Sequence, residues 1–172
     1  MRIVAGQWRG RNLIAPKGDI VRPTADRVRE AWMSIVSPWL PEARVLDLFA
    51  GSGALGIEAL SRGATSVDFV ESAMPSIKAI GENLKHVGAG DEARVHRMDA
   101  FAFIAALDAH AYDVAFADPP YDKGLSVTVA EQWLAAPFAD ILGIEHGAFE
   151  SMPDGGERRR YGSSAITFYR TA

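Results

Sequence analysis

Residues 45–53, Val-Leu-Asp-Leu-Phe-Ala-Gly-Ser-Gly, decide the fold. The apolar run that begins at Arg44 predicts a buried strand, and the glycine-rich turn after it leads into a helical pattern at residues 55–60. Gly51-Ser-Gly-Ala-Leu-Gly56 satisfies the pattern G-x-G-x-x-G. The glycines alone indicate only a tight turn and close helix packing. Their place between a strand and a helix favours a nucleotide-type site whose backbone N–H groups face a ligand.

Strand and helix patterns alternate along the rest of the chain. Apolar runs predict further strands at residues 66–71, 93–96, 112–117 and 143–149. Helical spacing of apolar residues predicts helices at 76–86, 100–107 and 126–135. Such alternation gives right-handed crossovers and a parallel sheet with helices on both faces, so we expect an α/β domain over residues 41–172. Residues 158–161 and 165–170, separated by a Gly-Ser-Ser turn, predict an antiparallel hairpin at one sheet edge.

The composition excludes several classes of protein. With 172 residues, 48% of them hydrophobic and 23% charged, the chain resembles ordinary globular domains. It has no cysteine, which excludes disulfides and thiolate metal sites, and its four histidines show no metal-ligand spacing. Apolar runs of the length that a secretory signal or a membrane span needs are absent. We therefore expect a monomeric cytoplasmic protein that binds neither metal nor membrane.

Charge is distributed unevenly along the chain. Residues 1–30 carry seven positive and three negative groups, a balance of +4, whereas the remaining 142 residues carry 11 positive and 19 negative groups, a balance of −8. We treat residues 1–40 as a basic N-terminal arm and helix. Arginine outnumbers lysine by six to one in the basic stretch, which suits forked contacts to phosphate oxygens. A merely solvated basic strand and turn is the alternative.

Three carboxylates lie where strands of the predicted sheet end, the edge at which such sheets bind ligands. Glu71 follows Gly51 by 20 residues and could accept hydrogen bonds from both ribose hydroxyls, or be only an exposed strand-end acid. Asp99 could accept from an adenine amino group, cap the next helix, or do both. The cofactor could be a nicotinamide dinucleotide or S-adenosylmethionine. Asp47 favours the latter, because a carboxylate would repel a pyrophosphate but attract an amino group and a sulfonium.

Asp118-Pro-Pro-Tyr121 follows the fourth predicted strand. Each proline fixes its own φ, removes an N–H and restricts the preceding residue, so the loop is stiff. Asp118 and the Pro119 carbonyl then become fixed acceptors beside the flat face of Tyr121. Two acceptors and a stacking surface suit the exocyclic amino group of a nucleobase, a poor nucleophile that must be held and aimed at a methyl donor. An ordinary turn is the structural alternative.

Together the two motifs resemble those of class I S-adenosylmethionine-dependent methyltransferases that modify exocyclic amines. With residues 2–11 and 22–31 of the arm, the chain resembles, over nearly its whole length, the bacterial 16S ribosomal RNA guanine-N2 methyltransferase family. Glu145-His146 and Arg159-Arg-Tyr-Gly162 match the tail of that family. The resemblance implies a Rossmann-like, mostly parallel seven-stranded sheet. It also implies methyl transfer to N2 of one guanine in 16S ribosomal RNA, within the small subunit or its assembly intermediate.

The motifs and the resemblance together give a set of expected site residues. The cofactor-binding residues would be Asp47, Phe49, Gly51, Ser52, Gly53, Glu71, Ser72, Asp99 and Ala100. The catalytic loop would be Asp118, Pro119, Pro120 and Tyr121. The arm would contact RNA through Arg9, Arg11, Arg22, Arg27 and Arg29, although Arg27 could instead pair with an acid on the body.

Three other functions stay open on the sequence alone. Asp-Pro-Pro-Tyr fixes an amine but does not identify the base, so an adenine-N6 or other exocyclic-amine methyltransferase is the nearest alternative. The glycine motif with Glu71 also fits an NAD-dependent oxidoreductase. A basic arm would equally suit an RNA-binding assembly factor without catalytic activity.

Overall fold

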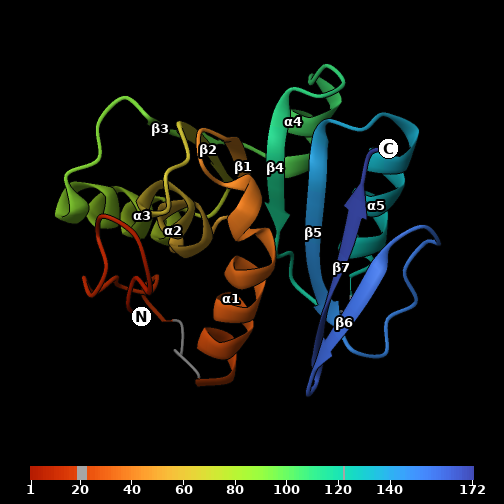
Figure 1. The fold of residues 1–172 in the computed structure, drawn as a ribbon, viewed down its shortest axis with the longest axis horizontal. Coiled ribbons are helices and arrows are strands. Elements are labelled where there is room, and N and C mark those ends of the chain that lie inside the picture. The colour runs from red at the N-terminus through yellow and green to blue at the C-terminus, as the bar shows by residue number, and fades with distance from the viewer. Residues whose placement is uncertain (19–22, 122) are drawn as a thin grey trace.

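The computed structural model describes residues 1–18, 23–121 and 123–172, and it contains one seven-stranded sheet of order β3-β2-β1-β4-β5-β7-β6 (Figure 1). The strands are β1 (Arg44–Leu48), β2 (Ser66–Glu71), β3 (Ala93–Arg97), β4 (Tyr112–Ala117), β5 (Ala139–Gly147), β6 (Glu157–Tyr161) and β7 (Ser164–Arg170). The helices are α1 (Pro23–Val36), the short 3₁₀ helix η1 (Ser37–Trp39), α2 (Ala54–Ser61), α3 (Met74–Val87), α4 (Ala100–Ala105) and α5 (Leu125–Ala135).

The expected architecture is confirmed. Strands β1 to β5 pair in parallel, and β7 runs antiparallel between β5 and β6, so the C-terminal hairpin closes one edge of the sheet. The largest boundary difference is in β5, which begins at Ala139, four residues before the expected start, and ends at Gly147, two residues before the expected end. Asp140 interrupts the apolar run near the start of that strand, and the other boundaries differ by at most two residues. The chain leaves β1 in one direction to β2 and returns to β4 on the other side, so the order of the sheet reverses beside β1.

Two apolar layers hold the helices against the sheet. Alternate residues of each strand point to opposite faces, so Val45 of β1 joins the core under α1, α2 and α3, whereas Leu46 joins the core under α4 and α5. Trp32 of α1 contacts Phe116 of β4 edge to face, with ring centroids 5.6 Å apart. The packing therefore places α1 directly over the centre of the sheet (Figure 1).

The N-terminal residues are part of this core rather than a separate tail. Ile3, Trp8 and Leu13 are buried in the same cluster as the helices of that face. The backbone N–H groups of Val4 and Ala5 donate to the buried carboxylate of Glu58 in α2, at 2.9 and 3.1 Å. The arm is thus attached to α2 by hydrogen bonds as well as by apolar contacts.

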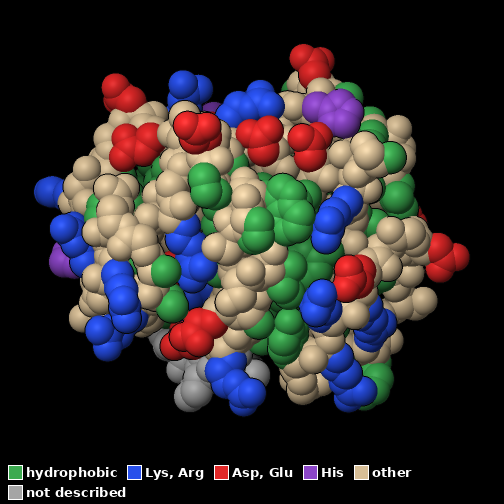
Figure 2. All heavy atoms as spheres, in the orientation of Figure 1, with side chains coloured by type: hydrophobic (Ala, Val, Ile, Leu, Met, Phe, Trp, Pro, Cys, Tyr) green, Lys and Arg blue, Asp and Glu red, His purple; other side chains and the backbone are tan. Residues whose placement is uncertain are grey.

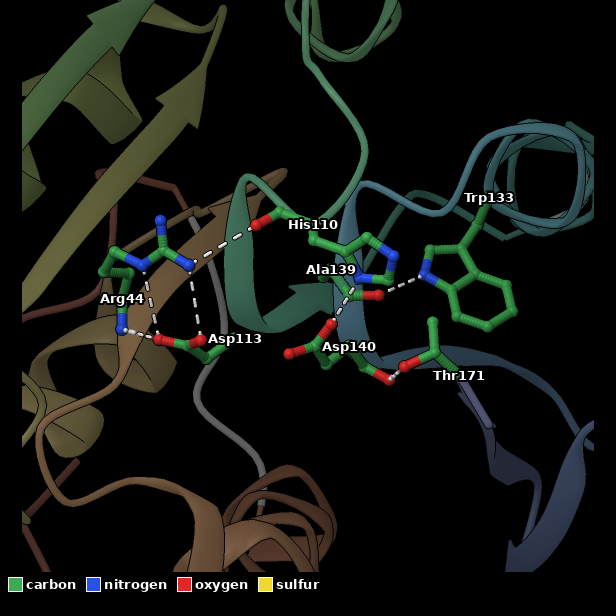
Figure 3. A network of polar contacts seen from close by, with 7 residues as sticks. All are labelled: Arg44, His110, Asp113, Trp133, Ala139, Asp140 and Thr171. Carbon is green, nitrogen blue, oxygen red and sulfur yellow. Dashed lines mark hydrogen bonds and ion pairs between the residues drawn. The ribbon is translucent and has the colours of Figure 1, made fainter.

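Polar contacts join the amino ends of three strands, far from the edge where a ligand is expected (Figure 3). The guanidinium of Arg44 in β1 lies 3.4 Å from the Asp113 carboxylate in β4. The His110 ring, before β4, lies 2.6 Å from the Asp140 carboxylate in β5. The indole N–H of Trp133 in α5 donates to the Ala139 carbonyl at 2.8 Å. These contacts align β1, β4 and β5 and leave their carboxyl ends free for a site.

Gly6→Ala tests the docking of the N-terminal residues. Gly6 has φ +90°, and a Cβ atom there would lie 1.8 Å from the Ser61 carbonyl oxygen. Gly18 has a similar φ of +94° but open space around it, so Gly18→Ala is a matched control for backbone strain alone. We expect Gly6→Ala to lower Tm at least about 3 °C further than Gly18→Ala, measured by circular dichroism. Equal Tm values for the two variants would show that the segment is not docked on α2.

Candidate active site

A hollow lies at the carboxyl ends of β1, β2, β4 and β5. It consists of a cavity of about 770 Å³ beside the Asp118 loop and a smaller one of about 300 Å³ beneath α1. The two cavities adjoin, since both are lined by Ala25, Val28, Phe49, Gly51, Asp118 and Glu145. Residues that the sequence analysis assigned to cofactor and to catalysis are therefore brought together in one continuous site.

The glycine motif forms the floor of the site and serves two purposes. Gly51 and Gly53 have φ values of +59° and +80°, which an L side chain rarely adopts, and Phe49 before them is held at +54°. Gly56 instead allows close packing, because a Cβ atom there would lie 2.4 Å from the Phe69 ring in β2. The turn and the helix packing named in the sequence analysis are both real. The strained backbone of Phe49 is a further indication of a functional site, and the sequence patterns did not predict this strain.

Asp47 connects this turn to the strand before it. Its carboxylate is 1% exposed and accepts the Gly56 N–H at 3.0 Å. Burial raises the pKa of Asp47 to about 8, the Gly56 hydrogen bond opposes that rise, and the negative charge of Glu71 adds to it. Asp47 lines the smaller cavity, so a cation bound there would favour its ionised form.

Glu71 at the end of β2 is already engaged by the backbone. Its two carboxylate oxygens accept three N–H groups, from Gly51 at 2.9 Å and from Ser72 and Ala73 at 2.8 Å each. A carboxylate offers about four acceptor positions, so about one remains for a ligand. Glu71 therefore fastens the glycine turn to β2 in addition to lining the larger cavity.

Asp99 has the helix-capping role that the sequence allowed. Its carboxylate accepts the Ala102 N–H at 3.0 Å at the start of α4, while the residue also lines the larger cavity. Phe101, which the sequence analysis did not single out, lines the same cavity and meets the Phe49 ring at an angle of 69° with centroids 6.0 Å apart. Of the expected cofactor residues, Gly53 and Ala100 do not line either cavity: Gly53 precedes α2 and Ala100 is buried in α4.

The structure adds Glu145 to the expected catalytic loop. Ala117 of β4 pairs with Ile144 of β5, so the next residues, Asp118 and Glu145, lie side by side at the strand ends. The two carboxyl groups are close enough for Glu145 to affect the protonation of Asp118. Asp118 borders the open cavity, but surrounding protein displaces enough water to raise its pKa well above the usual value. The neighbouring Glu145 raises this pKa further, and Asp47 adds to the effect.

The rest of the loop is fixed to the C-terminal hairpin. Pro119 is buried and Pro120 is exposed, and the Tyr121 hydroxyl lies 2.8 Å from the Ser164 hydroxyl at the start of β7. Tyr121 is 36% exposed and lines the larger cavity. The position of Tyr121 therefore depends on contacts between segments 43 residues apart.

Arg29, expected to contact RNA, lies instead in the wall of the smaller cavity beneath α1 and is 8% exposed. Its Nη2 donates to the Arg2 carbonyl at 2.8 Å and lies 3.7 Å from the Asp26 carboxylate. Its Nε is buried and donates to no acceptor within the described ranges. Among the described residues that line the two cavities, Arg29 has the one cationic side chain, and the acids are Asp26, Asp47, Glu71, Asp99, Asp118 and Glu145.

The other expected RNA contacts lie on the surface. Arg9, Arg11 and Arg27 are exposed, although Arg11 also donates to the Val87 carbonyl at 3.2 Å, and Arg22 lies outside the described residues. Arg27 forms no ion pair with a described acid. Figure 2 shows Lys and Arg side chains gathered mainly in the lower half of this view, toward which β4 and β5 run, and acids mainly along the upper edge.

The described part of the chain holds no group of three His, Asp or Glu side chains that could ligate a metal ion. It also contains no helix that is long and apolar enough to cross a membrane.

Solved structures define the class to which this fold and site belong. A putative methyltransferase from Escherichia coli is 34% identical, with a TM-score of 0.84 over 99% of this chain and 97% of that one. A 16S rRNA N2 G1207 methyltransferase of T. thermophilus, in complex with AdoMet and guanosine, is 19% identical, with a TM-score of 0.69 over 96% of this chain and 46% of that one. The second likeness extends to the fold alone. The fold is that of a methyltransferase.

Sequence relatives then give the family. The family model described as "Conserved hypothetical protein 95" matches residues 1–170. Ribosomal RNA small subunit methyltransferase D of Escherichia coli K12 is 41% identical over 140 residues, or 78% of this chain and 70% of that protein. A putative rRNA methyltransferase of Bacillus subtilis is 33% identical over 99% of this chain and 98% of its own length. The chain belongs to this family of small-subunit ribosomal RNA methyltransferases.

Asp47→Asn tests whether the Asp47 carboxyl keeps its proton in the folded protein. The native state keeps a proton on Asp47 between its unfolded pKa near 4 and its folded pKa of about 8, whereas the unfolded chain releases it. The free energy of unfolding should therefore fall as pH rises through this window, by at most about 1.4 kcal/mol per pH unit for one group. Asparagine can still accept the Gly56 N–H but cannot ionise.

We expect the stability of Asp47→Asn, relative to the wild type, to increase steadily from pH 5 to pH 8 in urea unfolding experiments. A constant difference between the two proteins across that range would contradict the raised pKa.

Proposed function

We propose that the protein transfers a methyl group from S-adenosylmethionine to the exocyclic N2 amine of one guanine in 16S ribosomal RNA. The carrying observation is the pair of adjacent carboxyl groups, Asp118 and Glu145, at the mouth of the hollow beside the stiff Pro119-Pro120 turn. The substrate would be the RNA within the small subunit or its assembly intermediate, in the cytoplasm, and the enzyme would act as a monomer.

The two cavities suit the two ends of S-adenosylmethionine, whose chemistry is to present an electrophilic methyl group on a positively charged sulfur. Glu71, Asp99 and Phe101 line the larger cavity with acceptors and an aromatic ring suited to a nucleoside. Asp47 in the smaller cavity suits the amino group of the methionine end. A pyrophosphate would meet acids throughout this hollow, which argues against a nicotinamide dinucleotide.

Arg29 suits the carboxylate of the methionine end. It is a buried guanidinium whose polar contacts among the described residues are one carbonyl and a carboxylate 3.7 Å away, and its Nε has no acceptor among those residues. A buried cation of this kind is stabilised by an anion that can accept its remaining N–H groups. The carboxylate of S-adenosylmethionine would supply one, so we assign Arg29 to the cofactor and not to RNA.

The catalytic loop would act mainly by positioning. The Asp118 carboxyl oxygens and the Pro119 carbonyl would accept the N–H groups of the amine, and Tyr121 would stack on the base once it is turned out of its surroundings. Bound S-adenosylmethionine would supply the methyl group: the N–C bond would form as the S–C bond breaks, and S-adenosylhomocysteine would be left. The amine is left with one proton too many, which the Asp118–Glu145 pair can accept and pass to water.

Glu145 favours guanine over adenine. Guanine presents two adjacent donors, N1–H and the N2 amino group, and two adjacent carboxyl groups can accept from both. Adenine presents an acceptor at N1, so beside its amino group it could bond only to a carboxyl group that keeps its proton, whereas guanine can use both groups as acceptors. The fold relative from T. thermophilus, which acts on a guanine N2, holds AdoMet and guanosine together on such a scaffold.

Residues 1–40 would add an RNA-facing extension to the catalytic domain of residues 41–172. Arg9, Arg11 and Arg27 are exposed on this extension and suit phosphate contacts.

Methyl transfer to small subunits that lack the modification tests the proposed reaction. We expect N2-methylguanosine as the product in nuclease digests, and a loss of at least about 100-fold in kcat for Asp118→Ala, with S-adenosylhomocysteine affinity within about twofold of wild type. Arg94→Ala, on the exposed surface of β3, is the control and should keep full activity. N6-methyladenosine as the product, or full activity of Asp118→Ala, would refute the assignment.

Calorimetry with two ligands tests the role of Arg29. S-adenosylhomocysteine carries the amino-acid carboxylate, whereas 5′-methylthioadenosine lacks it. Arg29→Met should weaken S-adenosylhomocysteine binding by about tenfold or more, the loss expected for a charged hydrogen bond, and leave 5′-methylthioadenosine affinity unchanged. Equal weakening of both ligands would mean that Arg29 only supports the fold of α1.

A further inference from the structure

Phe149, in the turn after β5, is 85% exposed, whereas no other large apolar side chain of the described residues exceeds 48%. Leaving a phenyl ring in water forgoes the stabilisation that burying it would give. An exposed ring of this kind marks a candidate contact surface when the backbone holds it in place.

The backbone does hold this ring in place. The Gly147 N–H donates to the Glu150 carboxylate at 2.6 Å, and the Glu150 N–H donates back to the Gly147 carbonyl at 3.0 Å. Arg158 of β6 donates to the Glu150 carbonyl at 3.0 Å, and the Ala148 N–H is also hydrogen-bonded to the β6–β7 turn. These hydrogen bonds close the turn, and the closed turn holds the Phe149 side chain toward solvent.

The neighbouring strand gives the ring a basic setting. The Arg160 guanidinium lies over the Phe149 ring, 4.9 Å from its centroid, and is itself oriented by a hydrogen bond of 3.0 Å to the Gly162 carbonyl. Arg158 and Arg159 are exposed on the same strand. An exposed ring beside a planar cation can stack a nucleobase, and Arg158, on the same face of β6 as Arg160, can contact a phosphate of the same RNA strand.

This pair of side chains is close to the proposed base-binding loop. Gly147 of β5 pairs directly with Ser164 of β7, and the Ser164 hydroxyl lies 2.8 Å from the Tyr121 hydroxyl. Phe149 follows Gly147 by two residues, so only a short stretch of fixed backbone separates it from the catalytic loop. A strand of RNA whose target base enters the cavity could therefore extend to this part of the surface.

We infer that Phe149 and Arg160 form a platform on which an unpaired nucleotide next to the target base stacks. The inference rests on the proposed function for the identity of the RNA. It adds a contact beyond the target base, by which the enzyme would recognise a locally single-stranded segment and not a duplex.

Three variants test the platform. Phe149→Ala should raise KM for small subunits that lack the modification by at least about fivefold, the loss of one base–aromatic stack, with kcat and S-adenosylhomocysteine affinity unchanged. Phe149→Trp should restore KM, because a larger ring can still stack. Trp39→Ala is the matched control, since Trp39 also carries an arginine, Arg170, 4.7 Å over its ring but lies near the amino ends of the strands.

Direct binding of protein-free 16S ribosomal RNA, measured by fluorescence anisotropy, separates the platform from the reaction. A weaker affinity for Phe149→Ala, with Trp39→Ala like wild type, supports the platform even if no methyl transfer is found. Unchanged RNA affinity and KM for Phe149→Ala would overturn it, as would an equal loss for Trp39→Ala. A loss seen with subunits but not with protein-free RNA would overturn it in favour of a ribosomal protein contact.

Discussion

The hydrogen bond from the Gly56 N–H to the buried Asp47 carboxyl is the contact on which the site depends. It joins the end of the central strand to the helix after the glycine turn and so fixes the turn between them. Glu71 fastens the same turn from β2 by accepting the Gly51 N–H. Asp47 and Glu71 thus fix the backbone turn that lines the site. Because Asp47 is buried, its protonation state also depends on the charge of a bound ligand.

Local patterns predicted the strands well because each strand carries its own apolar signature. Residues 66–71 and 112–117 match β2 and β4 to the residue, and the hairpin follows its turn signal. The start of β5 was not predicted, because Asp140 interrupts the apolar run near that end of the strand. The strand still pairs with β4 there. The glycine turn and the Asp118 loop could be found because the residues that act together are also contiguous in the sequence.

Glu145, Arg29 and Phe101 could not be assigned in this way, because their roles depend on the register of β5 and on how α1 and α4 are placed. Arg29 is the instructive case. Its charge and its neighbours in the sequence indicate an RNA contact, but the side of α1 that it occupies faces the sheet, and only the packing of Trp32 on Phe116 determines that side. The sequence likewise does not reveal that residues 1–18 contribute three buried side chains, Ile3, Trp8 and Leu13, to the core.

On the face that Figure 2 shows, acids gather mainly toward one end of the sheet and basic side chains mainly toward the other, which has a consequence for kinetics. At physiological salt, surface charges act over only about 8 Å, so a polyanion meets either the acidic edge or the basic edge and not their average. Collisions through the acidic edge are repelled, and collisions through the basic edge are prolonged. With an overall charge of −4, the protein also gains little attraction to bulk RNA. Encounters through the basic edge, toward which β4 and β5 run, would therefore last longer than encounters through the acidic edge.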